Sequence, residues 1–379
     1  ENIKDIDFND GDVLVTDMTD PDWEPIMKKA SAIITEKGGR TCHAAIVARE
    51  LQVPCCVGAT GCLTKINENQ LITLDCTQGE EAYVYDGSVE FTREEINYSK
   101  LPEPPVDIML NVADPQRAFQ YANIPNKGVG LVREEFIINN FIQVHPLALI
   151  NYNSEQISND IVLKNKIDEI TKGYDNKIDY FVDRLTYGLA RIATAFFPNN
   201  VIVRFSDFKS NEYANLLGGK YYEPHEENPM IGWRGASRYY SEKYESAFGL
   251  ECMAIKRLRE EMGFTNIIVM IPFCRTPKEC VRVLETMEKY GLKRGDYGLK
   301  VYIMCELPSN VILADEFCKH VDGFSIGSND LTQLVLGLDR DSELVQHLYD
   351  ERNQAVKMMI SQAIKSCKRN NVKIGICGQ

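Results

Sequence analysis

Apolar residues in the first hundred positions occur in short runs with the spacing of β-strands, and turn-forming residues separate these runs. The runs are DVLVT, SAIIT, QLITLD and AYVYD. A longer helical pattern lies between the second and third runs; it begins near His43, continues to about Leu51 and is stopped by Pro54. Short strands combined with one clear helix predict a small α/β domain over residues 1–98.

A proline-rich stretch follows this first domain. The sequence SKLPEPPVD holds three prolines within four positions. Proline fixes φ and removes a backbone donor, so such a stretch favours a stiff, extended chain and disfavours helix. We therefore expect a linker at residues 99–106 that acts as the hinge between the first domain and the rest of the chain.

Beyond the linker, apolar runs of strand length alternate with helical stretches. Seven runs can be counted: DIMLNV, GVGLVR, VIVRFSD, IIVMIPF, KVYIMCELP, GFSIGSND and VKIGICGQ. Buried parallel strands that alternate with helices are the signature of a doubly wound sheet or a (β/α)8 barrel. Seven strands and an abrupt end favour a TIM-type barrel over residues 107–379 that is truncated before its last β/α unit, with a mostly helical insertion at about 145–200.

Composition and charge narrow the classes of partner. The chain has 379 residues, 44% hydrophobic content and a formal net charge of −13, a balance that disfavours nucleic acid and anionic membranes. No apolar run approaches the ~20 residues of a membrane span, and the first residues lack the layout of a secretory signal. The twelve cysteines include no Cys-x-x-Cys pair and lie in apolar runs, which is typical of reduced core thiols. We expect a cytoplasmic protein.

The first candidate for chemistry is the histidine that opens the predicted helix. In GGRTCHAAIVAREL, Gly38 and Gly39 precede His43, and Thr41 adds a hydroxyl donor. A helix N-terminus offers unpaired N–H groups and a partial positive charge, which together suit a phosphoryl group. Neutral imidazole is nucleophilic near neutral pH. The pattern predicts that His43 carries a phosphoryl group; the alternative is a histidine that merely caps or packs the helix.

Two acids and a thiol occupy the expected carboxyl ends of barrel strands, where the working residues of such barrels sit. Glu306 in MCELPSN and Asp330 in GSNDLTQ supply carboxylates that suit Mg²⁺. Cys377 in GICGQ supplies a thiol that can act as acid or base. The alternatives are a surface or helix-capping role for either acid, and chance placement for one cysteine among twelve.

Three arginines fall in similar positions. Arg133 lies in GVGLVREEF, Arg204 in VIVRFSD and Arg234 in NPMIGWRGASRY. Guanidinium donors match the oxygens of a phosphoryl group and neutralise charge during its transfer. Taken singly, each is more often an ordinary salt-bridge residue, and their shared place at strand ends favours anion binding.

These segments together resemble the phosphoenolpyruvate (PEP)-utilizing enzymes, which include phosphoenolpyruvate synthase, pyruvate phosphate dikinase and enzyme I of the sugar phosphotransferase system. The histidine motif carries Cys42 where the dikinase and enzyme I typically have serine, and it looks most like the synthase. The segments VRFSDFKSNEYANLLGG, YYEPHEENPMIGWRGASRY and GFSIGSNDLTQLVLGLDRDS, with KGYDNKIDYFVDRLT in the insertion, extend the likeness over essentially the whole chain.

The resemblance implies a role for each candidate residue. His43 would be the phosphohistidine and Cys377 the proton donor or acceptor, while Glu306 and Asp330 would bind Mg²⁺. The implied substrate-binding residues are Arg133, Arg204, Arg234, Gly327, Ser328, Asn329, Asp330 and Arg340. Gly38, Gly39 and Thr41 would support the phosphohistidine.

An activity follows from the same resemblance. The first domain would swivel between an ATP site and the barrel, and phospho-His43 would transfer its phosphoryl group to the enolate of pyruvate. In the complete enzyme, ATP, pyruvate and water would give AMP, phosphoenolpyruvate and phosphate. Such enzymes carry the ATP-binding domain on the N-terminal side, so that domain is missing from this chain. The resemblance is also compatible with a homo-oligomer, a dimer or larger, formed through the barrel.

Alternatives stay open within this family and outside it. Pyruvate phosphate dikinase uses phosphate in place of water, and enzyme I shares the order of histidine domain and barrel. A non-catalytic assembly or carrier protein on the same scaffold is an alternative of another class. A metal-dependent aldolase or lyase barrel would fit the two acids, but it would leave His43 without a task.

Overall fold

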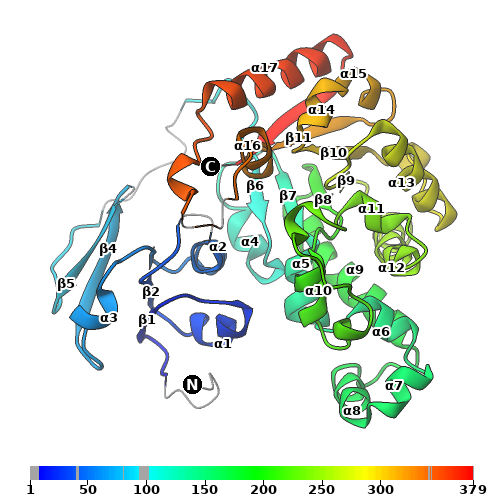
Figure 1. The fold of residues 1–379 in the computed structure, drawn as a ribbon. Coiled ribbons are helices and arrows are strands. Elements are labelled where there is room, and N and C mark those ends of the chain that lie inside the picture. The colour runs from blue at the N-terminus through cyan, green and yellow to red at the C-terminus, as the bar shows by residue number, and fades with distance from the viewer. Residues whose placement is uncertain are drawn as a thin grey trace. The chain divides into compact units, whose positions relative to one another are not determined.

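The computed structural model describes residues 8–39, 42–79, 81–93, 102–339, 342 and 344–378. The chain divides into two compact units (Figure 1): unit 1 comprises Glu1–Leu101 and Leu338–Tyr349, and unit 2 comprises Pro102–Gly337 and Asp350–Gln379. The linker at 99–106 and the domain boundaries on either side of it stay predictions, because residues 94–101 lie outside the described ranges.

Unit 1 contains a parallel sheet and a separate antiparallel hairpin. The sheet has the order β1-β2-β3, and its strands are β1 (Val13–Thr16), β2 (Ala32–Thr35) and β3 (Cys55–Cys56). The hairpin consists of β4 (Ile72–Gln78) and β5 (Glu81–Asp86). The helices are α1 (Glu24–Met27), α2 (His43–Leu51) and α3 (Cys62–Lys65). The predicted small α/β domain is confirmed; the two-residue strand β3 was not predicted, because it is too short to show a pattern.

Helix α2 is anchored along one side. Ala44, Val47, Ala48 and Leu51 are buried against the core of unit 1, with the i, i+3, i+4, i+7 spacing of an apolar helical stripe. The helix ends at Leu51, and the next residue, Gln52, adopts a left-handed conformation and donates its N–H to carbonyls of the last turn. This packing fixes the direction of α2 and therefore the place of its amino end.

Unit 2 is built on seven parallel strands that neighbour one another in chain order, from β6 to β12. They are β6 (Leu110–Val112), β7 (Val129–Arg133), β8 (Val201–Arg204), β9 (Ile267–Ile271), β10 (Val301–Cys305), β11 (Gly323–Gly327) and β12 (Lys373–Cys377). Each of the seven predicted runs forms one of these strands.

Helices connect successive strands and cover the outer face of this sheet (Figure 1). They are α4 (Ala118–Tyr121), α5 (Glu134–Ile137), α6 (Pro146–Ile150), α7 (Glu155–Asn159), α8 (Ile161–Ile170), α9 (Lys177–Phe196), α10 (Ser210–Asn215), α11 (Ala236–Tyr239), α12 (Glu245–Lys256), α13 (Pro277–Lys289), α14 (Pro308–Ile312), α15 (Ala314–Phe317), α16 (Ser328–Leu336) and α17 (Gln354–Arg369). In the described part of the chain, none of the helices has the length and apolar character needed to cross a membrane.

The sheet of unit 2 curls into a half-barrel. Leu131, Ile202, Met270 and Met304 come from four successive strands and pack in one cluster on the inner face, and Cys377 of β12 packs against the same cluster. Strand β12 also approaches β7, although the two are not neighbours in the sheet. A flat sheet could not bring these strands together, so the predicted α/β barrel class is confirmed.

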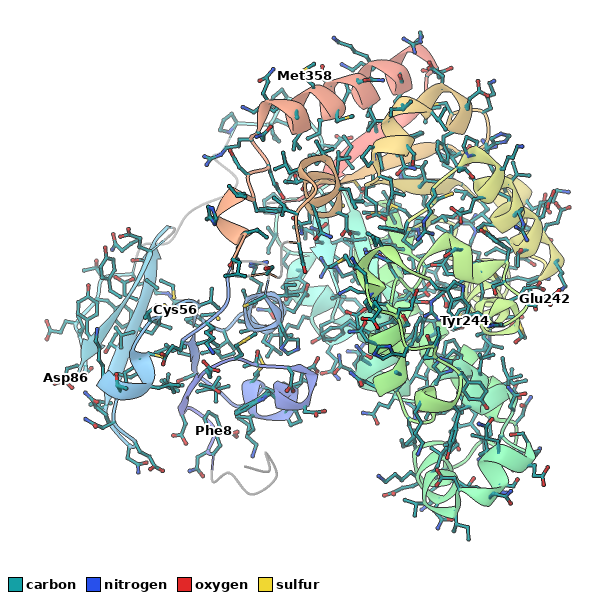
Figure 2. All side chains as sticks on the ribbon, in the orientation of Figure 1. Phe8, Cys56, Asp86, Glu242, Tyr244 and Met358 are labelled. Atoms are coloured by element: carbon teal, nitrogen blue, oxygen red, sulfur yellow. The ribbon has the colours of Figure 1, made fainter. Side chains whose placement is uncertain are left out.

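A second, larger core fills the space between the sheet and its helices. The 20-residue helix α9 contributes a buried side to this core, begins at Asn176, whose side chain caps Ile178 N, and ends before Pro198. Tyr244 is fully buried among these helices, whereas Met358 on the outer side of α17 is 63% exposed (Figure 2). The outer layer supports the strands, and their inner carboxyl ends remain available for chemistry.

Candidate active site

Strand alternation places the predicted polar residues on the inner face of unit 2. Successive residues of a strand point to opposite faces, so a residue two positions beyond an inward one also points inward. The residues two positions beyond the inward Leu131, Ile202 and Met304 are Arg133, Arg204 and Glu306. Cys377, at the end of β12, is itself in the inner cluster. These side chains therefore share one end of the half-barrel.

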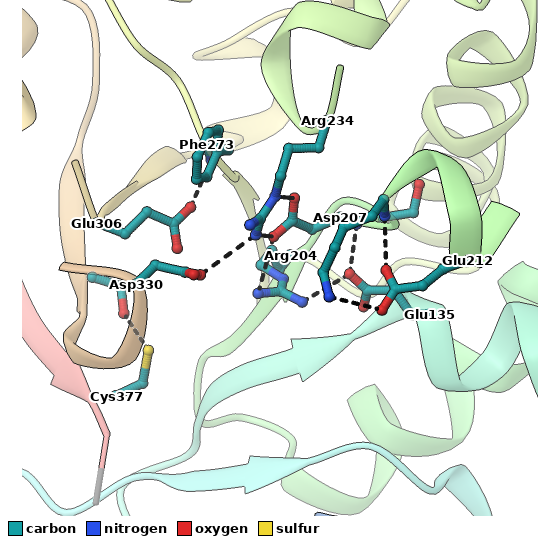
Figure 3. Close-up of polar contacts among 12 residues, drawn as sticks. Glu135, Arg204, Asp207, Glu212, Arg234, Phe273, Glu306, Asp330 and Cys377 are labelled. Atoms are coloured by element: carbon teal, nitrogen blue, oxygen red, sulfur yellow. Dashed lines mark hydrogen bonds and ion pairs between the residues drawn. The ribbon is translucent and has the colours of Figure 1, made fainter. Parts of the chain in front are cut away.

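Arg234 lies at the centre of the site and is 3% exposed. It donates from Nε to Asp207 Oδ1 at 3.0 Å and from Nη2 to Asp207 Oδ2 at 2.5 Å, and its Nη2 lies 3.4 Å from Asp330 Oδ2 (Figure 3). Its guanidinium also sits over the ring of Phe273, 4.1 Å from the centroid. Burial alone would lower the pKa of Arg234, but the charges of Asp207 and Asp330 outweigh burial and raise it.

Arg204 extends the same network. Its Nη2 donates to Glu135 Oε1 at 2.8 Å, and its Nη1 lies 3.7 Å from Asp207 Oδ2. These two acids keep the pKa of Arg204 above its ordinary value against the opposing effect of burial. Among the described residues, its Nε has no hydrogen-bond partner although it is buried. A buried donor without an acceptor is costly, and an anionic ligand would supply one.

Glu306 is 1% exposed and points into the same region from the end of β10 (Figure 3). Its Oε1 accepts the backbone N–H of Phe273 at 2.7 Å, and Asn310 Oδ1 accepts its own N–H at 3.2 Å. Burial, followed by the nearby charges of Asp330 and Asp207, raises the pKa of Glu306 to about 8. When buried carboxylates lie close together, each one disfavours ionisation of the others. A bound cation would stabilise their ionised forms.

Cys377 faces the site from the end of β12. Ser325 Oγ lies 3.5 Å from its Sγ, and the thiol lies 3.5 Å from the carbonyl of Ile326. Burial raises the pKa of the Cys377 thiol; Ser325 and the positive charge of Arg204 act in the opposite direction. A change in the charge balance around the arginines would therefore alter the acidity of this thiol.

The junction where β11 passes directly into α16 contains the remaining predicted ligands. A Cβ on Gly327 would lie 2.7 Å from Met304 Cε and 2.9 Å from Glu306 Oε2, so glycine leaves room for the Glu306 carboxylate. Ser328 is buried and its Oγ donates to Glu351 at 3.1 Å. Asn329 and Asp330 belong to the first turn of α16, and Asp330 points toward Arg234.

His43 is the first residue of α2 in unit 1. Its Nδ1 lies 3.0 Å from Thr19 Oγ1. Burial lowers the pKa of His43, with Asp20 acting in the opposite direction, so the imidazole is neutral at pH 7. Gly38 has φ +101°, and a Cβ there would lie 2.9 Å from Cys42 Sγ. A bond from Nδ1–H to Thr19 would leave Nε2 as the nucleophile.

Gly39 comes directly after Gly38, and the side chain of Gln346 from the same unit occupies the space that a Cβ on Gly39 would need. Two predicted site residues, Thr41 and Arg340, lie outside the described residues.

Sequence reasoning missed three residues that hold the predicted ones. Asp207 and Glu135 orient the arginines, and Thr19 orients the histidine. Asp207 and Glu135 lie within three residues of Arg204 and Arg133 at strand ends, so position was an available signal for both. Thr19 lies 24 positions before His43 in a polar loop and gave none.

Comparison with known proteins assigns the chain to a family. Residues 8–79 match the model described as "PEP-utilising enzyme, mobile domain". Residues 94–379 match the model described as "PEP-utilising enzyme, PEP-binding domain". The chain belongs to the PEP-utilising enzymes. Within this family the mobile-domain match contains His43, and the PEP-binding match contains all of the inner-face residues described above.

Several curated relatives of this PEP-utilising chain share one name. Proteins called phosphoenolpyruvate synthase are 54% identical in Aquifex aeolicus (98% of this chain, 48% of that protein) and 57% identical in Synechocystis (98% and 45%). The Escherichia coli K12 protein of that name is 54% identical over 97% of this chain and 46% of its own length. The chain thus spans about half the length of these curated relatives.

Proposed function

We propose that the chain is the phosphohistidine and pyruvate-handling portion of a phosphoenolpyruvate synthase. In the complete enzyme ATP, pyruvate and water would give AMP, phosphoenolpyruvate and phosphate. The observation that carries the proposal is the convergence of two arginines, two acids and a thiol at one end of the half-barrel: Arg204, Arg234, Glu306, Asp330 and Cys377. The name shared by relatives at 54–57% identity supports the same reaction.

Glu306 and Asp330 are the residues that would hold Mg²⁺. Among the described residues, no group of three or more His, Cys, Asp or Glu side chains is arranged to hold a metal ion. Magnesium is usually held by one or two carboxylates and completed by substrate oxygens and water, so a two-acid site fits it. Burial is the main cause of the raised pKa of Glu306, and the negative charges of Asp330 and Asp207 add to it. When bound, Mg²⁺ would draw electron density from the carboxylate and keto oxygens of pyruvate and favour enolisation.

The thiolate of Cys377 removes a proton from the methyl group of pyruvate, and the electrons of that C–H bond form the C=C bond of the enolate. The enolate oxygen attacks phosphorus, the bond between phosphorus and the His43 nitrogen breaks, and the imidazole leaves. Arg204 and Arg234, with Arg133, Ser328 and Asn329 as further substrate-binding residues, hold the phosphoryl oxygens and the substrate. The buried Nε of Arg204, which lacks an acceptor among the described residues, supports this role.

Unit 1 acts as a carrier in this scheme. Phosphorylated His43 at the amino end of α2 is stabilised by helix N–H groups and by Gly38, Gly39 and Thr41. The domain of residues 1–98 swivels on a hinge at 99–106 between the barrel and the ATP-binding domain of the complete enzyme. Arg340 contributes a further positive charge, and the enzyme works in the cytoplasm as a homo-oligomer.

Product analysis of the full-length protein tests the overall reaction. Incubation with ATP, pyruvate and Mg²⁺ is expected to release AMP and phosphate in equal amounts, with no requirement for added phosphate. Release of pyrophosphate with consumption of phosphate would instead identify a dikinase, and absence of turnover would favour the carrier alternative.

Proton exchange at the methyl group of pyruvate tests the half-reaction. In the full-length enzyme, exchange with deuterated water is expected to be lost in Cys377→Ala by a factor of about 100 or more, the size of a general acid–base contribution. Cys318→Ala is a suitable control, because Cys318 is another half-buried thiol on the outer layer. Equal exchange in the two variants would remove Cys377 from the mechanism.

A further inference from the structure

Two carboxyl groups lie buried behind the site and have no role in the reaction described above. Glu134 begins α5 directly after Arg133, and Glu251 lies in the middle of α12. Both are fully buried, at 0% exposure, and their carboxyl groups are within hydrogen-bonding reach of each other. Two adjacent buried acids need either a cation or a shared proton, because two ionised groups would repel strongly in a low-dielectric interior.

The hydrogen bonds indicate different protonation states for Glu134 and Glu251. Ser206 donates to Glu251 from its backbone N at 3.0 Å and from Oγ at 2.6 Å. The Tyr244 hydroxyl donates to Tyr213 at 2.5 Å, and the Tyr213 hydroxyl lies 2.6 Å from Ser206 Oγ. Because Ser206 uses its one hydroxyl proton on Glu251, this chain of hydroxyls points toward Glu251, as it would toward an anion.

Glu134 has the opposite environment. Among the described residues, neither of its oxygens receives a hydrogen bond. An ionised carboxylate would be expensive here, whereas a protonated one can donate to Glu251 and needs no donor of its own. Burial raises the pKa of Glu134 well above its ordinary value, and it raises that of Glu251 to about 7.

Within the described ranges, the surroundings of the pair supply one arginine as compensating positive charge. The titratable and charged groups that interact most strongly with the pair are Glu135, Arg204, Tyr213, Tyr239, Tyr244 and Cys252. Arg204 is the cation in this set, and it pairs with Glu135 and Asp207. A proton is therefore the remaining means of holding the two acids together.

The pair connects the two strands that carry the substrate arginines. Arg133 and Arg204 are register partners in β7 and β8, Glu134 follows the first, and Ser206 comes two residues after the second. We propose that Glu134 and Glu251 share one proton at neutral pH and act as a positioning pair, which ties the ends of β7 and β8 together and so sets the spacing of Arg133 and Arg204.

The pair thereby also sets the place of Asp207, which follows Ser206 and binds Arg234. The functional consequence rests on the proposed role of these arginines; the shared proton does not. At high pH the last proton leaves, the two carboxylates repel each other, and the arginine ends move apart. Binding of an anionic substrate analogue then weakens.

The protonation state is tested first, because it does not depend on activity. Because the buried Glu306 can also hold a proton at pH 7, the spectrum of the wild type is compared with that of Glu134→Gln, and the infrared difference at pH 7 is expected to contain the carbonyl stretch of a protonated, buried carboxylic acid that the variant lacks. Glu279→Gln is the matched control, since Glu279 is another buried acid, on α13, and accepts hydrogen bonds from Arg275 N and Tyr240 Oη. A difference spectrum without such a band, or the same difference for Glu279→Gln, overturns the shared proton.

The positioning role is tested by the binding of oxalate with Mg²⁺ between pH 7 and pH 10. The wild-type affinity is expected to fall by about tenfold per pH unit once the shared proton is lost. Glu134→Gln keeps a neutral donor toward Glu251, so its affinity at high pH should exceed that of the wild type, whereas Glu279→Gln should follow the wild type.

If the affinity for oxalate depends on pH in the same way in the wild type, Glu134→Gln and Glu279→Gln, the positioning role is overturned even if the infrared band is present. If oxalate does not bind the wild type at any pH, the proposed function fails, while the infrared result still decides on the pair. Should Glu134→Gln not fold, the reciprocal variant Glu251→Gln serves: it should shift the acid band that Glu134 gives, and an unshifted band would exclude the pair.

Discussion

Asp207 accepts two hydrogen bonds from the Arg234 guanidinium, from Nε at 3.0 Å and from Nη2 at 2.5 Å. The same carboxylate lies 3.7 Å from Nη1 of Arg204. One carboxylate therefore orients two arginines from different segments of the chain. The fork of guanidinium donors matches a carboxylate geometrically, so the pairing fixes direction as well as distance. Nη1 of Arg234 donates to the carbonyl of Met230 at 3.1 Å, and Nη2 also lies 3.4 Å from Asp330 Oδ2.

Replacement of Asp207 by asparagine should affect both stability and binding. The amide keeps the shape of the carboxylate but loses its charge, which leaves two buried arginines with less compensation. Removal of one partner of a buried ion pair costs on the order of 3 kcal/mol, so we expect Asp207→Asn to lower the free energy of unfolding by about that amount and to weaken oxalate binding at least tenfold. Urea unfolding and titration calorimetry measure the two effects.

Asp315→Asn is the control for Asp207→Asn. Asp315 pairs with Arg369 at 2.5 Å, but both side chains are largely exposed, and exposed pairs contribute roughly 0–1 kcal/mol. A similar loss of stability in the two variants would contradict the importance assigned to burial at Asp207.

Gly327→Ala tests the space reserved for Glu306. The new methyl group would meet Met304 Cε at 2.7 Å and Glu306 Oε2 at 2.9 Å. The methionine can yield because its side chain is flexible, so the cost to stability should be about 1–3 kcal/mol, the range for overpacking. The displaced carboxylate should weaken Mg²⁺-dependent oxalate binding more than tenfold, as measured by calorimetry with and without Mg²⁺.

A second strand glycine provides the comparison for Gly327→Ala. A Cβ on Gly375 of β12 meets nothing within 4 Å, so Gly375→Ala should leave the affinity for oxalate near that of the wild type. If Gly327→Ala binds oxalate as well as Gly375→Ala does, the carboxylate of Glu306 does not need its observed position.

Thr19→Val tests the orientation of the histidine. Valine preserves the shape of threonine but removes the oxygen 3.0 Å from His43 Nδ1, which frees the ring and its tautomer. A hydrogen bond of this kind contributes about 1 kcal/mol, so phosphohistidine formed from phosphoenolpyruvate should appear about five- to tenfold more slowly. Phosphorus NMR should show the phosphoryl group on Nε2 in the wild type.

Thr64→Val controls for the loss of a threonine hydroxyl in the same unit. Thr64 is exposed on α3 and bonds to the carbonyl of Gly61 at 2.9 Å, away from the histidine. Its phosphorylation rate should equal that of the wild type. An equal decrease in Thr64→Val and Thr19→Val would indicate general destabilisation of unit 1 and not loss of orientation.

The sequence predicted the strands and the inner-face residues because both follow from local rules. Continuous apolar runs indicated the seven buried strands, and strand ends indicated Arg204, Glu306 and Cys377. The sequence does not show which of these residues pair with each other in the folded chain. Asp207 binds Arg234 across 27 positions and Glu134 meets Glu251 across more than a hundred, so their pairing depends on how strands and helices pack.

The free energy of unfolding of unit 2 should depend on pH, and the buried acids determine the direction of this dependence. The pKa of Glu251 in the folded chain is raised from 4.5 to about 7, so between these values the native state holds a proton that the unfolded state has lost. Stability must therefore fall as pH rises through this window, by up to about 1.4 kcal/mol per pH unit for each such proton. Glu306, whose pKa is raised to about 8, acts in the same direction.

Urea unfolding between pH 5 and pH 8 should show this decline in stability. Glu251→Gln should reduce the slope of the decline because the amide cannot ionise, whereas Glu279→Gln should not. A wild-type stability that rises over the same range would mean that these acids are ionised in the folded protein.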